Sequence, residues 1–530
     1  MSLLGYSVGL GTVWRFPYLA YSNGGGTFVF TFVLMFFLLG LPVMFLELAL
    51  GQYSGLGQSV MFDRLCPLFH GIDYGMISVS GIVSLYYTVI IAWCIMYFFA
   101  SITGELPWTK CDTEWATENC YSFKEADLCH QVSGQVYYKT VCYDATVSFE
   151  RNLSLLTRNV TRHPSAKDFF ERGVLHQSDG IGNIGVPQWK IMICLILAWF
   201  MPFAIFYFFH KGFKLKKKVG YFNILFHNVV LIILFSHGVT LPGAVDGIIY
   251  YLTPRFDKLG EAKVWSDAAS QILFALGPAW GCLNTLSRYN HFHNNCFKDT
   301  LIVGIGNILN SLFAGVVVFS LIGYLAHDFQ MPIDKVMDQG AGLPFIVYTD
   351  VLTRFSISPL FSVLVFVMMI ILGMGSECAL LETMTTAAQD TYPQLRVKKT
   401  YFFAVVCLIG FIGSLPVTCN FIFVFNFIQY KPMEFGDSDH LIFSNWIGWI
   451  LSLVPIILIL TFAIIKILKA PKEMHFRELH HQLLLKPSLF WDPARKVQTF
   501  DVYESNDGIS SFPSFISTVI PNFVSRDLKV

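Results

Sequence analysis

The sequence predicts an all-α polytopic membrane protein, because it is poor in charge, contains long apolar runs and carries its basic loops on one side. Of its 530 residues, 54% are hydrophobic and 14% are charged, whereas soluble domains carry roughly 25% charged residues. Several runs reach the roughly 20 apolar residues that a helix needs to cross a bilayer. Each run must be helical, because unpaired backbone amides in hydrocarbon are costly. The apolar runs make the lipid bilayer an expected partner. The formal net charge is zero, so nucleic acid is not expected as a partner.

The apolar runs define ten expected spans. They lie at 3–21, 27–49, 76–102, 189–210, 220–238, 267–287, 300–325, 359–384, 401–430 and 446–468. Lysine and arginine in short loops mark the cytoplasmic side of a membrane, and basic residues cluster at 211–218, 396–399 and 469–477. These clusters share one side if the spans alternate. The sequence therefore predicts a membrane domain at 1–470 and a cytoplasmic tail at 471–530.

The long loop at 103–188 falls on the other side of the membrane. It carries four cysteines, Cys111, Cys120, Cys129 and Cys142, and clustered cysteines are typical of disulfides in an oxidising compartment. Glycosylation sequons begin at Asn152 and Asn159, and such sequons belong to the surface loops of secreted chains. The sequence therefore predicts an extracellular loop with a disulfide and N-glycans.

Two spans contain residues that break helices. The first contains Gly5, Gly9 and Gly11, and the sixth contains Gly-Pro-Ala-Trp-Gly at 277–281. Small residues also let membrane helices pack closely, which explains the glycines but not Pro278 within an apolar run. Broken helices at matching places in two halves free carbonyls for cations and leave helix N-termini facing an anionic group. The pattern favours two broken helices around a binding site, with close packing as the alternative.

The residues at the first break carry a resemblance to a known family. GYSVGLGTVWRFPY at 5–18, followed by NGGG at 23–26, resembles the first-helix signature of the sodium/neurotransmitter symporter family. The resemblance continues through LELALGQ at 46–52 and GVTLPGA at 238–244. It covers about residues 3–470.

Within that family, the sequence is most similar to the sodium- and chloride-dependent glycine transporters. The stretches that carry this similarity include YYLTP at 250–254, NHFHNNC at 290–296 and LGMGS at 372–376. The resemblance implies a plasma-membrane protein with the inverted-repeat amino-acid transporter fold, in which helices 1 and 6 are broken. It also implies a disulfide between Cys111 and Cys120.

The resemblance implies a substrate site at the two breaks, formed by Gly9, Gly11, Tyr87, Phe274, Gly277 and Trp280. Gly9 stands where monoamine carriers have an aspartate, so the substrate is expected to bring its own carboxylate, as an amino acid does. Tyr87 would hydrogen-bond that carboxylate, with aromatic packing as its alternative role. Trp280 would leave little volume beside the α-carbon, which favours glycine, since overpacking costs about 1–3 kcal/mol. Phe274 would cover the substrate as a lid.

Sodium is a hard cation that prefers oxygen ligands, and the resemblance implies two sodium sites. The first would use Ser7, Thr12, Ala275 and Asn307, and the second would use Gly5, Val8, Leu372 and Ser376. Chloride would contact Gln271, Asn307 and Ser311. Phe32 and Ala275 replace a tyrosine and a serine of the family, so chloride dependence is left open. Glu377 is a further candidate as an intramembrane carboxyl, with pairing to a neighbour or a wet cavity as its alternatives.

Two gating residues can be located, and each lacks the partner that the family has. Arg15 resembles the outer-gate arginine, whose acidic partner lies on the tenth helix. Asp390 resembles the partner of a cytoplasmic gating residue that would precede the first helix, and this chain is short there. Near Cys419–Asn420 the resemblance passes from the ninth helix to the end of the eleventh. One to two helices are therefore expected to be missing, leaving about ten of twelve spans.

These observations predict a sodium-coupled symporter of a small amino acid, most specifically glycine, that works by alternating access. The missing segments leave open a non-transporting truncated isoform or regulatory partner. Another small neutral amino acid or a neurotransmitter is the alternative substrate, and a homo-oligomer is left open. No HExxH, GxSxG or P-loop motif is present, so the sequence does not predict an enzyme.

Overall fold

The structure is a computed structural model. It describes residues 2–111, 114–117, 119–133, 136–138, 141–144, 163–176, 188–209, 213–329, 331–336, 342–355, 357–419 and 440–469, together with residues 487 and 491. The predicted glycosylation sites Asn152 and Asn159 lie outside the described residues. Apart from residues 487 and 491, so does the predicted tail at 471–530.

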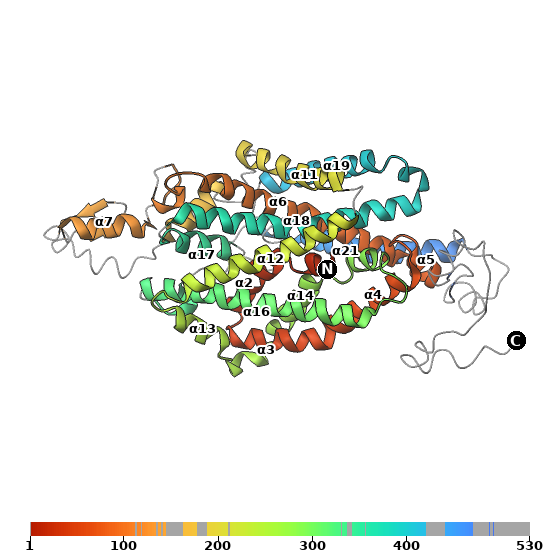
Figure 1. The fold of residues 1–530 in the computed structure, drawn as a ribbon, viewed down its shortest axis with the longest axis horizontal. Coiled ribbons are helices and arrows are strands. Elements are labelled where there is room, and N and C mark those ends of the chain that lie inside the picture. Colours follow the sequence, from red (N-terminus) through yellow and green to blue (C-terminus); the bar gives the residue numbers. More distant parts are fainter. Residues whose placement is uncertain are drawn as a thin grey trace.

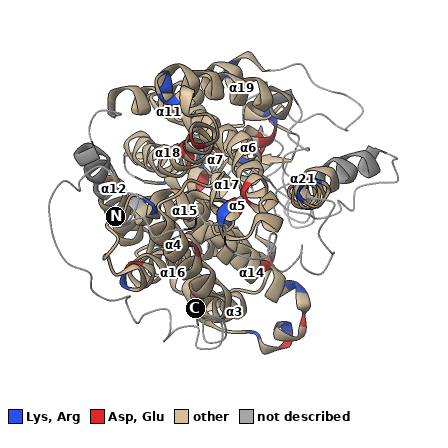
Figure 2. Cartoon of the chain, turned by 90° about the vertical axis from the view of Figure 1, so that its right-hand side faces the viewer, with Lys and Arg blue, Asp and Glu red and all other residues tan. Residues whose placement is uncertain are grey.

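The chain forms a bundle of long helices that run side by side along the longest axis of the molecule (Figure 1). The long helices are α6 (Gly71–Ser101), α11 (Trp189–Phe209), α12 (Phe213–Gly238), α16 (Cys296–Phe329), α18 (Ser358–Thr391), α19 (Lys399–Cys419) and α21 (His440–Leu468). Another apolar stretch joins α3 (Gly26–Met35), η2 (Phe36–Gly40) and α4 (Leu41–Ser54). α6 and α18 pack together at the centre, with α11 and α19 on one flank and α3 and α16 on the other (Figures 1 and 2).

Among the described residues, seven helices are long and apolar enough to cross a membrane. They are Gly26–Ser54, Pro67–Ser101, Trp189–Phe208, Cys296–Phe329, Ser358–Thr391, Lys399–Pro416 and Trp449–Leu468. The three other predicted spans are the two interrupted ones and α12, whose apolar part is Phe222–Gly238. Most of the helical ribbon carries no Lys, Arg, Asp or Glu when the bundle is viewed along its axis (Figure 2).

Short elements connect the long helices. They are α5 (Met61–Leu65), η3 (Pro67–Phe69), η4 (Pro107–Thr109), α10 (Ser165–Asp168), η5 (Phe169–Val174), α13 (Ala244–Leu252), η6 (Phe256–Gly260), η7 (Ile333–Lys335), α17 (Leu343–Leu352) and η8 (Pro393–Arg396). α13 and α17 pack against α16. They did not emerge as spans in the sequence because their 9 and 10 residues are too few to cross a bilayer.

Besides η4, α10 and η5, the described part of the long loop holds two small sheets and the helix α7 (Phe123–Ser133). β1 (Cys120–Tyr121) pairs parallel with β4 (His163–Pro164), and β2 (Val136–Tyr138) pairs antiparallel with β3 (Val141–Tyr143). Disulfides join Cys111 to Cys120 and Cys129 to Cys142, with Cα–Cα distances of 6.0 and 5.7 Å. The loop therefore contains the disulfide implied by the family resemblance and a second one.

Arg354, just beyond α17, holds the loop to the bundle. Its guanidinium lies 3.9 Å from the ring centroid of Phe123 on α7 and forms an ion pair of 2.6 Å with Asp328 on α16. Asp350 is buried beside it, and this burial raises the pKa of Asp350 to about 6 although Arg354 opposes the rise. α7 is thus attached through a cation–π contact supported by acidic residues.

Both predicted interruptions are present. The first span consists of α1 (Ser2–Ser7), the π-helical turn η1 (Gly11–Arg15) and α2 (Phe16–Ser22), with non-helical backbone at Val8 and Gly9. The sixth consists of α14 (Ala262–Leu276) and α15 (Cys282–Ser287). Between them, Gly277, Ala279 and Gly281 have φ of 62°, 62° and 78°. This left-handed conformation costs a non-glycine residue such as Ala279 roughly 1–2 kcal/mol.

Side chains from neighbouring helices hydrogen-bond the backbone of the sixth-span break. The Ala279 N–H donates to Glu47 Oε1 of α4 at 2.5 Å, and the Ser80 hydroxyl of α6 donates to the Trp280 carbonyl. The Tyr6 hydroxyl of α1 donates to the Gly277 carbonyl at 3.3 Å. Because backbone groups in a bilayer have no water to bond, these three contacts make the interruption tolerable.

Glu47→Ala should destabilise the protein, because it leaves the Ala279 N–H without its acceptor. The loss is expected to lower the free energy of unfolding by about 1–3 kcal/mol. Glu47→Gln is the matched control, since its amide oxygen can still accept the hydrogen bond, and it should cost less. Thermal unfolding of the detergent-purified protein measures both. Equal losses for the two variants would show that the hydrogen bond is not what supports the break.

Candidate substrate and cation site

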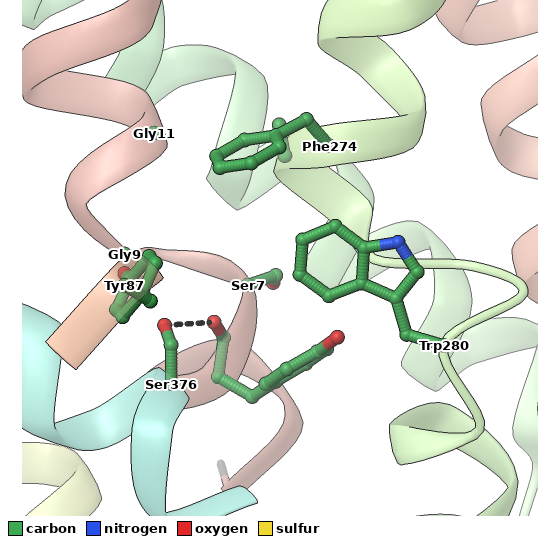
Figure 3. Close-up of a pocket in the computed structure, with 9 residues that line it drawn as sticks. Ser7, Gly9, Gly11, Tyr87, Phe274, Trp280 and Ser376 are labelled. Atoms are coloured by element: carbon green, nitrogen blue, oxygen red, sulfur yellow. Dashed lines mark hydrogen bonds between the residues drawn. The ribbon is translucent and has the colours of Figure 1, made fainter. Parts of the chain in front are cut away.

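A small cavity lies between the two breaks. It is lined by Tyr6, Ser7, Gly9, Gly11, Tyr87, Phe274, Ala275, Trp280 and Ser376. Its volume is about 20 Å³, enough for one or two water molecules at roughly 10–15 Å³ each. Figure 3 shows Phe274 and Trp280 projecting into it from one side, opposite Gly9, Tyr87 and Ser376. The site is polar where the backbone of the first span is broken and aromatic where the sixth is.

Five of the six predicted substrate residues line this cavity, and Gly277 does not. A Cβ at Gly277 would overlap the ring of Tyr6, whose hydroxyl donates to the Gly277 carbonyl. Tyr6 itself lines the cavity and was missed by the sequence analysis. Its place beside Ser7 in the first-helix signature was the available signal, but only the fold shows that it reaches the second break.

Close approach of other side chains explains two glycines of the first span. A Cβ at Gly9 would lie 2.5 Å from Ser376 Oγ and 3.0 Å from the Tyr87 hydroxyl. A Cβ at Gly11 would lie 2.8 Å from the Phe274 ring. No aspartate fits at Gly9 without displacing Ser376 and Tyr87, so this site lacks the charge that would pair with a substrate amine.

Phe274 lies between the cavity and Arg15. Its ring meets the Trp280 ring edge-on, with centroids 5.4 Å apart. The Arg15 guanidinium lies 4.7 Å from the Phe274 centroid and donates to Ser270 Oγ at 2.8 Å. Arg15 and Phe274 together cover one side of the site, and Ser270 of the same helix anchors the arginine.

The predicted residues of the first sodium site are gathered around Asn307. Its Nδ2 lies 2.5 Å from the Ser7 carbonyl oxygen and 3.3 Å from that of Ala275, and its Oδ1 has no partner among the described residues. The two ends of an amide are assigned from such networks. Turning the amide would place Oδ1 beside two carbonyl oxygens, an arrangement that a cation stabilises. Thr12 is on η1, which packs against α16, and its hydroxyl donates to the Gly9 carbonyl at 2.8 Å. The residues present therefore fit a sodium ion.

The residues predicted for the second sodium site lie where α1 packs against α18. Gly5 is on α1, Val8 directly follows it, and Leu372 and Ser376 are on α18. The Ser376 hydroxyl donates to the Tyr6 carbonyl at 3.1 Å (Figure 3). A Cβ at Gly375 would lie 3.0 Å from the Gly5 carbonyl oxygen, so the two helices approach closely there.

The three predicted chloride residues are hydrogen-bonded to the protein backbone. Gln271 donates to the Gly11 carbonyl at 3.1 Å, and Ser311 donates to the Asn307 carbonyl at 3.0 Å. Asn307 itself faces Ser7 and Ala275, as described above. Phe32, where the family has a tyrosine, is fully buried with its ring centroid 4.8 Å from that of Phe16. No hydroxyl is available at that position.

Asp390 has two basic partners that the sequence analysis did not predict. Arg288, directly after α15, forms an ion pair with it at 2.6 Å, and Arg396 forms a second at 2.9 Å. Arg288 and Asp390 are both largely buried, whereas Arg396 is exposed. The turn after α15 therefore brings an arginine to the end of α18, where it pairs with Asp390. The absence of the gating residue that would precede the first helix stays a prediction.

Glu377 is hydrogen-bonded to a neighbour. It is fully buried, and its Oε1 accepts a hydrogen bond from the Ser84 hydroxyl of α6. Its Oε2 has no partner among the residues that the structure describes. Of the alternatives considered for Glu377, pairing with a neighbour is the one observed.

Two broken helices that face each other across a small cavity, within a bundle of apolar helices, are typical of secondary transporters. Comparison with known proteins gives the family. The model of the sodium:neurotransmitter symporter family matches residues 1–420. The chain therefore belongs to the sodium:neurotransmitter symporter family and is a multi-pass membrane protein.

The alignments with similar proteins cover different shares of those proteins. The chain is 35% identical to "Sodium- and chloride-dependent glycine transporter 1" of Xenopus laevis, over 93% of this chain and 87% of that protein. It is 40% identical to "Sodium- and chloride-dependent glycine transporter 2" of Xenopus laevis, over 79% of this chain and 53% of the relative. It is 36% identical to "Sodium- and chloride-dependent GABA transporter 2" of Mus musculus, over 81% of this chain and 67% of that protein.

The family match ends where the sequence places the junction, at residue 420. The alignment with glycine transporter 1 extends over 567 residues, although this chain has 530. Part of that relative therefore has no counterpart here. That the missing part consists of helices, and how many, stays a prediction.

Gly9→Ala should destabilise the protein through its contact with Ser376. Overpacking of this kind costs about 1–3 kcal/mol. In a Ser376→Ala background the same change should cost less, because the nearest remaining atom of residue 376, its Cβ, is 3.7 Å away. Thermal unfolding of wild type, the two single variants and the double variant gives the coupling energy between positions 9 and 376.

Gly104→Ala serves as the control for Gly9→Ala, since nothing lies within 4 Å of a Cβ at Gly104. It should leave thermal unfolding nearly unchanged. An equal cost of Gly9→Ala with and without the Ser376 hydroxyl would contradict the described packing of the site.

Proposed function

We propose that the chain is a sodium-coupled symporter of a small amino acid, with glycine as its substrate, that works by alternating access. The observation that carries the proposal is the set of polar and aromatic groups that meet between the two breaks. They surround a cavity of about 20 Å³, which would have to widen to admit glycine. Membership of a sodium symporter family supports it. The fold would be the inverted repeat of that family, in a membrane domain at 1–470 that lies in the plasma membrane.

The chemistry around the cavity favours a zwitterion without a side chain. Tyr87 accepts a hydrogen bond from the Leu10 N–H at 3.1 Å. Its hydroxyl also hydrogen-bonds Ser376, and its proton would turn from there to a substrate carboxylate. Trp280 and Phe274 occupy the space where a larger side chain would lie. Two relatives are named glycine transporters. A third is named a GABA transporter, and GABA or another small neutral amino acid is the alternative substrate.

In this proposal, the sodium gradient supplies the free energy for uptake. One ion would bind Ser7, Thr12, Ala275 and Asn307, and a second would bind Gly5, Val8, Leu372 and Ser376. The first ion would lie beside the substrate carboxylate and attract it, which couples the two binding events. Gln271, Asn307 and Ser311 would contact chloride, although Phe32 and Ala275 supply no hydroxyl. Two of the relatives' names include chloride dependence along with glycine.

Two contacts would act as gates. Arg15 over Phe274 would close the outer side, and the Arg288–Asp390 ion pair would close the cytoplasmic side. The second contact joins the turn after α15 to the end of α18. Opening the inner side requires that this pair separate, so the pair would help set the balance between the two states.

A second function, a non-transporting isoform or regulatory partner, is favoured by the family match that ends at residue 420. Uptake of labelled glycine into cells that express this chain separates the two. Symport predicts uptake with sodium outside and none when choline replaces it. Protein delivered to the cell surface without sodium-dependent uptake would contradict symport and support the second function.

Trp280→Phe should widen the site and admit larger amino acids such as alanine. The change is expected to shift the preference for glycine over alanine by about 10–200-fold, the range for one methylene in a pocket. Competition against labelled glycine measures it, in this chain or in a version with the missing helices restored. Trp265→Phe is the matched control, because Trp265 donates to the Leu259 carbonyl and does not line the cavity. Unchanged selectivity in Trp280→Phe would contradict the pocket assignment.

Asn307→Ala should weaken sodium binding at the first site. Sodium that binds the folded protein raises its melting temperature with concentration, and this measurement does not require transport. The half-maximal sodium concentration should rise in Asn307→Ala. Asn310→Ala, on the same helix, should behave as wild type, since Asn310 donates to the Gly306 carbonyl of its own helix. The same sodium dependence in both variants would argue against a sodium ion at Asn307.

A further inference from the structure

Asn223 is a buried asparagine on α12 with an unexplained polar atom. Its side chain is 4% exposed, and its Oδ1 has no partner among the described residues. A buried acceptor without a hydrogen bond costs about 1–3 kcal/mol, so a bound water or ion is a usual explanation. α12 packs against α1 and α18, the two helices next to which the second sodium site is proposed.

The position of Asn223 is fixed by the glycine on α18. A Cβ built on Gly375 would lie 2.7 Å from Asn223 Nδ2 and 3.0 Å from the Gly5 carbonyl oxygen. The Asn223 amide and the Gly5 carbonyl therefore flank one point. Gly375 directly precedes Ser376 and has no side chain to place there, and the amide from α12 takes up that space.

The arrangement parallels the first sodium site. There, Asn307 reaches from α16 to the Ser7 carbonyl with its Nδ2 and leaves Oδ1 unpartnered. Asn223, on α12, also has an Oδ1 that is unpartnered among the described residues, and its Nδ2 lies on the other side of a Gly375 Cβ position from the Gly5 carbonyl oxygen, without a hydrogen bond to it. In each case the amide end near the carbonyl can turn from nitrogen to oxygen. An oxygen beside carbonyl oxygens is repulsive unless a cation lies between them.

We propose that Asn223 is a ligand of the second sodium site and supplies from α12 the side-chain oxygen that Gly375 lacks on α18. The inference rests on the proposed sodium symport and adds a residue to it. Amide oxygens are good ligands for hard cations. A ligand from α12 also ties that helix to α1 and α18, so sodium binding would draw three helices together.

The test is the sodium dependence of thermal unfolding of the purified full chain, with choline chloride keeping the ionic strength constant. Asn223→Ala should raise the half-maximal sodium concentration about ten- to a hundredfold, the range seen when a supporting group of a metal site is removed. Asn228→Ala is the matched control on the same helix, because Asn228 donates to the Ile224 carbonyl. It should behave as wild type.

An exchange of side chains makes the test sharper. Gly375→Ser alone should lower stability, because its Cβ would lie 2.7 Å from the Asn223 amide. In the Asn223→Ala background the clash with the amide is gone and only the contact of 3.0 Å with the Gly5 carbonyl oxygen remains, so the serine hydroxyl can face the ion. The double variant should then recover sodium binding that Asn223→Ala loses. Asn223→Asp, which keeps the shape and adds charge, should bind sodium at least as tightly as wild type.

Each outcome is decisive. Wild-type sodium dependence in Asn223→Ala, or an equal loss in Asn228→Ala, would overturn the role of Asn223 and leave the symport proposal standing. Looser sodium binding in Asn223→Asp would also overturn it. A wild-type protein that sodium does not stabilise would overturn this inference and the proposed symport together. Loss in Asn223→Ala with recovery by Gly375→Ser supports it.

Discussion

The structure depends on satisfying the backbone at two broken helices. Inside a bilayer, a carbonyl or amide that leaves a helix has no water to bond. In the sixth span, Glu47, Ser80 and Tyr6 supply the partners. In the first span, the partners are side chains of α6, α14, α16 and α18. Those four helices must surround the break, and this requirement sets the arrangement of the centre of the bundle.

The same contacts create the site. Asn307 donates a hydrogen bond to the Ser7 carbonyl. A sodium ion would bind that carbonyl oxygen instead, and the Asn307 amide would rotate to present its oxygen to the ion. A continuous helix has no backbone oxygens that a side chain could release to an ion. The interruptions therefore serve fold and proposed function together, and substitutions at these partners should affect stability and ion binding jointly.

The sequence predicted the breaks but not what holds them. Pro278 in an apolar run and the glycines of the first span are local signals, and five of six predicted substrate residues line one cavity. The partners could not be read from the sequence, because Glu47 and Ser80 lie more than 190 residues from the break they support. The same holds for Arg288, whose pairing with Asp390 depends on how the turn after α15 meets α18.

Ser376 is the last residue in the sequence that lines the cavity, and the predicted junction lies after it, near residue 420. Missing helices beyond that point would therefore remove no described wall of the site. They would remove the helix from which the family supplies an acidic partner for Arg15, which here bonds Ser270 of α14 instead. Binding and transport thus place different demands on this chain. The proposed ligands for sodium and substrate are present, whereas alternating access also needs the outer side to close and reopen. If the predicted helices are missing, this distribution favours a chain that would bind its ions and substrate yet move them slowly.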